Sequence, residues 1–399
     1  MNTFNLTHSI RLYPNKAQET FFKKACGCAR VAYNYGLGEY KKQLDAGQKP
    51  KVFDIKKQFN QEKKMLYPWM SETNKDANQQ PFTNLQKAFT RFFKKQGKFP
   101  VFKKKGIKDS FYISNDKFGV EETKFWIPKL GWVKGAEELR FKGKITSATI
   151  KRKANYWFVV VSVETENTHT ACENQAVVGV DLGIKTLATL SDGKVIESAS
   201  PLRKRLDKLK LLQRWLSRKV KGSSNRRKVI QRVSKVHYEV TCLRKDVLDK
   251  LTTYLCENYQ VICIEDLNVS GMVKNHCLAL SISDMGFGDF RRQLEYKSVL
   301  NGNTLIFADR WFPSSKMCSS CGAVKEDLTL SDRVYKCNCG LVINRDLNAA
   351  INLKNYGLKQ LRAVSPEVTP VEMEALTCRV ASETTVVEAG ISECSVMNT

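Results

Sequence analysis

At 399 residues, of which 42% are hydrophobic, the chain is long enough for two or three domains that each bury a core. Its 66 Lys and Arg against 40 Asp and Glu give a formal charge of +26, which favours a polyanionic partner such as nucleic acid. No run approaches the roughly 18 apolar residues of a membrane span, and the N-terminus has no apolar signal segment, so we expect a soluble, cytoplasmic protein without a membrane partner.

The residue pattern of the N-terminal half changes along its length from helical to β-like. The alternating segment 3–13 predicts a strand, and helical signals follow from Pro14 to about residue 96. From 110 to 164, β-branched and aromatic runs broken by Gly, Pro and Asn predict a small β-domain. A polar linker, "TENTHTACENQ", follows it.

From residue 176 the pattern changes to strand, hairpin, strand, long helices, strand, helix and strand, which is typical of an α/β layout. Asp192-Gly193 predicts a tight hairpin turn. The segment "SDMGFGDFRRQLEYKSVL" predicts one helix, with Ser283 or Asp284 as its N-cap. From Glu367 onward six Glu stand against one Arg, so we expect a loosely ordered tail.

Two segments carry most of the basic excess. Residues 87–108 hold nine Lys and Arg, no acid, and several interleaved Phe, while residues 203–235 hold fourteen Lys and Arg against Asp207 alone. A solvated helix face would normally mix both signs, so these clusters favour contact with a phosphate backbone. The phenylalanines recur at helical spacing and are expected in the core.

Four of the thirteen cysteines form a set with metal-ligand spacing. Two residues separate Cys318 from Cys321, fifteen residues follow, and Cys337 and Cys339 enclose a single residue; a glycine follows each pair. Four thiolates suit a tetrahedral structural Zn²⁺, whereas a disulfide is not expected in a reducing cell interior. The second pair is shorter than usual, so its turn must be tighter.

Three acids stand at the ends of predicted strands or at the start of a predicted helix. Asp181 ends the strand before "LGIKTL", Glu265 ends "VICIE", and Asp346 begins a short Ala-rich helix. Each alone has an ordinary explanation as a turn or capping residue. Together, carboxylates at close range repel one another unless divalent cations neutralise them, and oxygen ligands suit Mg²⁺ or Mn²⁺. The set predicts a two-metal site for phosphodiester hydrolysis.

These residues resemble the TnpB (OrfB) family of insertion-sequence-encoded RNA-guided DNA endonucleases, which are relatives of the type V CRISPR effectors. The resemblance extends over roughly residues 8–353. The matching segments are "RLYPNKAQETFFKKACGCARVAYNYGL", "RFFKKQGKFPVFKKK", "GVDLGIKTLATLSDG", "VICIEDLNVSGM", "SISDMGFGDFRRQLEYKS", "RWFPSSKMCSSCG" and "CNCGLVINRDLNAAINL".

The resemblance implies a multidomain α+β and α/β protein, in which a helical recognition region is nested in a β-barrel wedge and a RuvC-like nuclease domain has an RNase H-like fold. The expected parts are a first wedge strand (1–14), the helical region (15–105), the β-rich wedge (106–166), a linker (167–176), the nuclease domain (177–355) with an inserted zinc ribbon (314–342), and an acidic, disordered tail (356–399).

The resemblance also implies the activity and the site. A noncoding guide RNA from the transposon end would bind the protein and direct it to double-stranded target DNA beside a short motif, in a bacterial or archaeal cell. Asp181, Glu265 and Asp346 fall on the three catalytic positions, with Mg²⁺ or Mn²⁺ as the catalytic cofactor and Cys318, Cys321, Cys337 and Cys339 on one Zn²⁺. The family often has an aspartate where Asn344 stands.

Other interpretations stay open at this point. A nuclease-inactive, RNA-guided DNA-binding regulator would share the motifs, although all three acids are present here. "GVDLG" also resembles the first phosphate motif of actin-like and sugar-kinase ATPases, but that class needs a second Gly-rich phosphate loop, which the sequence lacks. The sequence does not give the oligomeric state.

Overall fold

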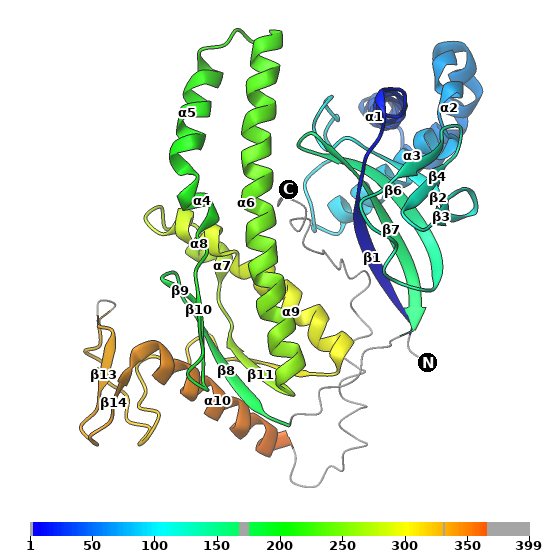
Figure 1. Cartoon of the computed structure of the whole chain (residues 1–399). Helices are drawn as coiled ribbons and strands as arrows, with labels where there is room; N and C mark the ends of the chain where they lie inside the picture. Colours follow the sequence, from blue (N-terminus) through cyan, green and yellow to red (C-terminus); the bar gives the residue numbers. More distant parts are fainter. Residues whose placement is uncertain (1–2, 167–174, 330–331, 365–399) are drawn as a thin grey trace. The chain divides into compact units, whose positions relative to one another are not determined.

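The computed structural model describes residues 3–166, 175–329 and 332–364. These divide into two compact units, 3–166 and 175–364, each with its own core (Figure 1). Most of the expected linker, and the expected tail from residue 365, lie outside the described residues. Within them, no helix has the length and apolar character of a membrane span.

The first unit packs helices against an antiparallel sheet of strand order β1-β7-β6-β2, beside a smaller sheet β3-β4-β5. Its N-terminal strand pairs with β7 along its whole length, from Thr3 with Glu166 to Leu12 with Trp157. The elements are β1 (Thr3–Leu12), α1 (Lys16–Asp45), α2 (Val52–Leu66), η1 (Pro68–Glu72), α3 (Lys75–Phe93), β2 (Ser110–Ser114), η2 (Asn115–Lys117), β3 (Gly119–Glu121), β4 (Lys124–Ile127), β5 (Gly131–Lys134), β6 (Lys144–Lys153) and β7 (Tyr156–Glu166).

The helices predicted before residue 96 and the strands predicted from 110 to 164 are confirmed. The long first helix begins after Asn15, because the Asn15 and Gln18 side chains each accept a hydrogen bond from the other's backbone N–H. Not every predicted core phenylalanine is buried: Phe89 is, whereas Phe93, one helical turn further on, is 66% exposed. The prediction was wrong for Phe93, which is the last residue of α3, where the chain leaves the helix.

The second unit contains a mixed sheet of order β10-β9-β8-β11-β12, in which β8, β11 and β12 run parallel. Helices α5 and α6 form a long pair that extends away from this sheet (Figure 1). The elements are β8 (Val177–Leu182), β9 (Thr186–Leu190), β10 (Val195–Glu197), α4 (Pro201–Lys204), α5 (Leu206–Ser217), α6 (Ser224–Asn258), β11 (Val261–Glu265), α7 (Val269–Met272), α8 (Ala279–Met285), α9 (Phe287–Asn301), β12 (Thr304–Ala308), β13 (Val334–Lys336), β14 (Val342–Asn344) and α10 (Arg345–Val364).

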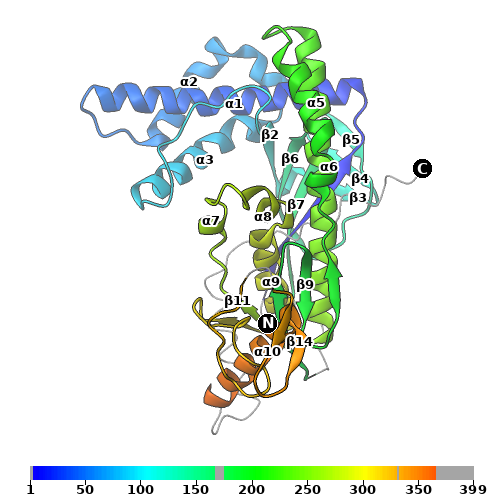
Figure 2. The same ribbon diagram turned by 90° about the vertical axis from the view of Figure 1, so that its left-hand side faces the viewer.

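The two faces of this sheet carry different side chains, because successive residues of a strand point to opposite faces. Val178 and Val180 belong to the core that includes residues of α6 and α9. The opposite face contacts α10, which lies along β8 and β11. The β13–β14 hairpin also contacts α10 (Figure 2).

The hairpin turn predicted at Asp192-Gly193 is confirmed. Gly193 has φ +90° between β9 and β10, and the Asp192 side chain accepts a hydrogen bond from Lys194 N at 2.9 Å. The left-handed backbone conformation explains the glycine.

The single helix predicted from Ser283 was wrong. Ser283 and Asp284 lie inside α8, and Gly286, with φ +74°, separates α8 from α9. Asp284 instead caps a helix far away in sequence, because its buried carboxylate accepts hydrogen bonds from Leu202 N at 2.9 Å and Arg203 N at 3.1 Å. The Ala-rich helix is also longer than predicted, and α10 continues to Val364.

Candidate metal centres

Asp181 and Glu265 lie side by side at the ends of adjacent parallel strands. The register pairs Val180 of β8 with Ile264 of β11, so the next residues along both strands are the two acids. Neighbouring strands are about 4.8 Å apart, and both side chains point to the same face. Each acid is half-buried.

Helix α10 brings the third acid to this strand end. A Cβ on Gly179 would overlap the Ala350 carbonyl oxygen and the Lys354 amide nitrogen, so the helix backbone touches β8 at this glycine. Asp181 is two residues beyond Gly179 on the same face, and Asp346 is one helical turn before Ala350. Glycine is required because any side chain would push the helix away.

The charges of the three acids interact. Burial, followed by the negative charges of Glu265 and Asp346, raises the pKa of Asp181 to about 8, and the Arg345 guanidinium opposes this rise. Without a cation the cluster therefore retains a proton near neutral pH. The donor set consists of hard carboxylate oxygens, which fits Mg²⁺ or Mn²⁺.

Asn344, which stands where the resemblance suggests an aspartate, immediately precedes α10. Its side-chain oxygen accepts hydrogen bonds from Asp346 N at 2.9 Å and Leu347 N at 3.2 Å. Asparagine caps a helix as well as aspartate does. The substitution therefore keeps the start of the helix that carries Asp346.

A second layer of contacts holds Glu265 in place. The Ser314 hydroxyl donates to Glu265, and the buried Asn352 amide of α10 donates to the Ser314 carbonyl at 2.7 Å. Asp266, the next residue, accepts hydrogen bonds from Arg291 and Arg310, which hold the pKa of its carboxyl below the usual range. Sequence reasoning missed Ser314 and Asn352, because a lone serine or asparagine has no spacing signal.

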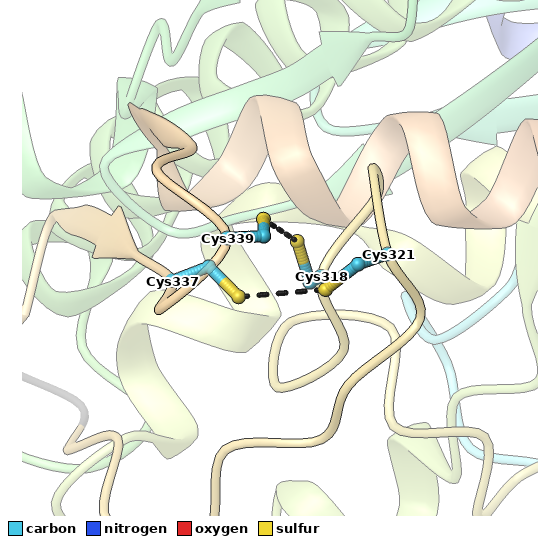
Figure 3. Close-up of side chains that lie close together, drawn as sticks. All are labelled: Cys318, Cys321, Cys337 and Cys339. Carbon is cyan, nitrogen blue, oxygen red and sulfur yellow. Dashed lines mark hydrogen bonds between the residues drawn. The ribbon is translucent and has the colours of Figure 1, made fainter.

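The four cysteines converge from two turns (Figure 3). Their Sγ atoms all lie within 4.8 Å of one another, with Cys318 to Cys339 at 3.7 Å and Cys321 to Cys337 at 3.6 Å. A tetrahedral ion with Zn–S bonds of about 2.3 Å separates its sulfur ligands by about 3.8 Å. The thiol arrangement therefore fits a structural Zn²⁺.

The shorter Cys337-x-Cys339 pair is accommodated by a tight turn. Gly340 N donates to the Cys337 carbonyl at 3.1 Å, and Gly322 N donates to the Cys318 carbonyl at 2.9 Å. Both glycines have positive φ, +92° and +77°. Each pair thus closes its turn on the residue type that tolerates this conformation.

The cysteine turns are tied to α10 by two buried asparagines. Asn348 donates to the Met317 carbonyl at 2.7 Å and accepts from Ser319 N at 3.0 Å, while Asn352 also donates to the Met317 carbonyl. In the part of the chain that the structure describes, the four cysteines are the one group of three or more His, Cys, Asp or Glu with all ligand atoms within 4.8 Å of one another. The oxygens of the three acids are spaced more widely.

The fold and the two centres define a mixed helix-and-sheet protein with an acidic sheet edge beside a four-cysteine cluster. Residues 159–276 match the family OrfB_IS605, "Probable transposase", and residues 287–353 match "Cas12f1-like, TNB domain". Residues 1–49 match HTH_OrfB_IS605, "Helix-turn-helix domain", and the described ones form β1, α1 and the start of the following loop.

Curated relatives match along most of the chain. "Putative RNA-guided DNA endonuclease" of Streptomyces pristinaespiralis is 36% identical over 87% of this chain and 88% of its own length. "Putative RNA-guided DNA endonuclease InsQ" of Escherichia coli K12 is 31% identical over 87% of this chain and 91% of its own. This chain belongs to the TnpB (OrfB) family.

A solved structure shares the fold. A chain of the Cas12f1–sgRNA–target DNA complex superposes with a TM-score of 0.55 at 14% identity, over 85% of this chain and 83% of that one. The two chains therefore share a mixed helix-and-sheet fold.

Proposed function

We propose that this chain is a transposon-associated RNA-guided DNA endonuclease whose nuclease domain has the RNase H-like (RuvC) fold. Membership of the TnpB family and the printed activity of relatives above 30% identity support this function. The observation that carries the catalytic assignment is the adjacency of Asp181 and Glu265 across β8 and β11, with α10 and its Asp346 laid over Gly179.

The chemistry proposed for this site is metal-assisted hydrolysis of a DNA phosphodiester. A pair of Mg²⁺ or Mn²⁺ ions, held by Asp181, Glu265 and Asp346, would activate the attacking water and stabilise the leaving oxygen. Ser314 fixes the Glu265 carboxylate, and Arg345 offsets part of the negative charge around Asp181. The protein thus orients three ligands on rigid elements, since two sit on central strands and one on a long helix.

The remaining parts would have separate roles. The first unit would hold the recognition region (15–105) and the wedge (1–14 and 106–166), and the second the nuclease domain (177–355) with its zinc ribbon (314–342). A noncoding guide RNA and double-stranded target DNA are the proposed partners. The basic segments 87–108 and 203–235 would bind their phosphate backbones, because nearly all the charged side chains of both are positive.

The test begins with the nucleic acid that the protein carries. RNA that copurifies with the full chain is sequenced, and a plasmid bearing a sequence that matches this RNA is incubated with the complex in Mg²⁺. We expect a cut at the matched site and none in a plasmid with a scrambled site. Asp181→Ala should abolish cutting while RNA and DNA binding persist, and Asp116→Ala, at a 64% exposed side chain outside both basic segments, is the control.

Two results would refute the assignment. If Asp181→Ala cuts at the wild-type rate, the site lies elsewhere. If the wild type binds RNA and matched DNA without cutting under any divalent ion, the chain is a nuclease-inactive DNA-binding regulator.

A further inference from the structure

Trp311 is an apolar side chain in an unusual position. Its side chain is 86% exposed, the highest value among the large exposed hydrophobic residues that the structure describes. It lies three residues after the end of β12, which runs parallel to β11. The indole is therefore near the sheet end at which Asp181 and Glu265 stand.

The loop that carries Trp311 is fixed on both sides of it. On one side, the Arg310 guanidinium donates to Asp266 at 2.6 Å. On the other, the Ser314 hydroxyl donates to Glu265. The two anchors are consecutive residues at the end of β11, so the loop segment 310–314 is bonded to the catalytic strand at both of its ends.

The next residue in the chain, Phe312, is also aromatic, but its side chain packs against the protein interior. Phe312 points to the core, where its ring centre lies 4.8 Å from that of Tyr356 on α10. Trp311 N also donates to the Asp309 side chain at 2.8 Å, and Phe312 N donates to the Asp309 carbonyl at 3.0 Å. This tight turn directs Phe312 inward and leaves the indole in water.

An exposed indole on a fixed loop suits one kind of contact in this setting. A strand cut by the three acids must pass beside this loop, because its phosphate has to reach Asp181 and Glu265. The bases of an unpaired strand expose flat aromatic faces. These faces can stack on a protein aromatic ring, and every base has such a face, so the contact does not depend on sequence. A base inside a duplex has both faces covered by its neighbours, so an unpaired base is the partner that suits this ring.

We propose that Trp311 stacks on an unpaired base of the DNA strand entering the acidic site and so sets which phosphodiester is cut. This inference rests on the proposed nuclease function, and it assigns Trp311 a substrate-positioning role. The aromatic ring is the property that matters, so Trp311→Phe should retain most of the effect and Trp311→Ala should lose it.

The first test compares cleavage by the full RNA-loaded chain. With DNA at limiting concentration, Trp311→Ala should cut on the order of tenfold more slowly than wild type, because base stacking is removed. At saturating DNA the deficit should shrink, and the cut ends should spread over neighbouring phosphates. Trp126→Ala, at a 41% exposed indole of β4 in the other unit, is the matched control.

A second comparison isolates the stacking contact. An abasic position walked along the cut strand should slow the wild type at one position, while Trp311→Ala should lose nothing further there. Such non-additivity identifies two groups that contact each other. Equal penalties in both proteins at every position would overturn the proposal, as would wild-type rates and unchanged cut ends in Trp311→Ala.

A binding readout separates this inference from the nuclease assignment. In the Asp181→Ala background, target DNA with a single 2-aminopurine should show quenched fluorescence at one position when Trp311 is present and recover it when Trp311→Ala is added. Absence of any Trp311-dependent quenching contradicts the stacking proposal. Absence of cutting by the wild type, with this quenching intact, contradicts the nuclease assignment alone.

Discussion

Gly179 determines how closely α10 approaches the sheet. Because Gly179 has no side chain, the backbone of Ala350 and Lys354 can pack directly on β8. This contact joins the strand that carries Asp181 to the helix that carries Asp346. A methyl group here would overlap main-chain atoms, which cannot rotate away as a flexible side chain can. The helix would therefore have to shift.

We expect Gly179→Ala to lower the free energy of unfolding by about 1–3 kcal/mol, because overpacking of a tight contact strains the backbone. Nuclease activity should fall much further than nucleic-acid binding, since Asp346 moves with α10. Urea unfolding and a cleavage assay measure the two effects. Gly288→Ala is the control, because its added Cβ would meet nothing within 4 Å; equal behaviour of the two variants would contradict the proposed packing role.

The raised pKa of Asp181 predicts a dependence of stability on pH. In the folded protein without Mg²⁺, Asp181 keeps its proton up to about pH 8, whereas an unfolded Asp loses it near pH 4. The folded state then binds more protons between these values, so the free energy of unfolding should fall as pH rises from about 4 to about 8. Asp181→Asn should remove that part of the slope.

Chemical denaturation across this pH range, in Mg²⁺-free buffer that retains zinc, measures the effect. Added Mg²⁺ should restore stability at pH 8 in the wild type and not in Asp181→Asn. An unchanged slope in Asp181→Asn would show that the carboxyl is not protonated in the folded state.

At the scale of elements, α10 links the two centres. Its Asn348 and Asn352 hold the turn that contains Cys318, and Asn352 also holds the Ser314 carbonyl beside Glu265. Damage to the cysteine cluster should therefore reach the acidic site through this helix.

Cys318→Ser should lose bound Zn²⁺, reduce solubility and lower nuclease activity in whatever protein stays folded. Metal analysis of the pure wild type should give one zinc per chain. Cys277→Ser, at an exposed cysteine outside the cluster, should keep both zinc and activity. A wild type free of zinc would contradict the structural role assigned to the cluster.

The sequence predicts where strands end better than it predicts which residues lie next to one another at those ends. Asp181 and Glu265 could be found because each ends a buried apolar run, but their adjacency depends on the parallel register of β8 and β11, which no local pattern encodes. Asp346 could be found because it begins an Ala-rich helix, and the resemblance to TnpB implied a catalytic role for all three acids. Asp284 was misassigned because a buried carboxylate can cap a helix 82 residues away as readily as its own. Trp311 carried no periodicity signal at all.

At the scale of the whole molecule, the excess of positive charge is divided unevenly. The segment 203–235 covers α4, α5 and the first part of α6, and it holds fourteen basic residues against one acid. The α5–α6 pair therefore extends a strongly positive surface away from the sheet (Figure 1). A polyanion bound there releases counterions, which makes its affinity depend on salt.

Replacing Lys208, Lys210, Arg214 and Arg218 together by Gln should weaken nucleic-acid binding and flatten its salt dependence. Removal of one phosphate contact lowers the slope of log affinity against log salt by about 0.7–0.9. Lys42→Gln, at an exposed lysine already paired with Glu39, should leave the slope unchanged. Filter binding of the copurified RNA at several salt concentrations measures both, and an unaltered slope in the fourfold variant would exclude this surface from binding.

The proposed catalysis requires Asp181, Glu265 and Asp346 to hold a pair of divalent cations jointly. The most direct measurement is anomalous diffraction from crystals of the full chain soaked in Mn²⁺. We expect two anomalous peaks roughly 4 Å apart among these three carboxylates, and the disappearance of both in Asp181→Ala. Mn²⁺ bound elsewhere, with no peak at this sheet edge, would contradict it.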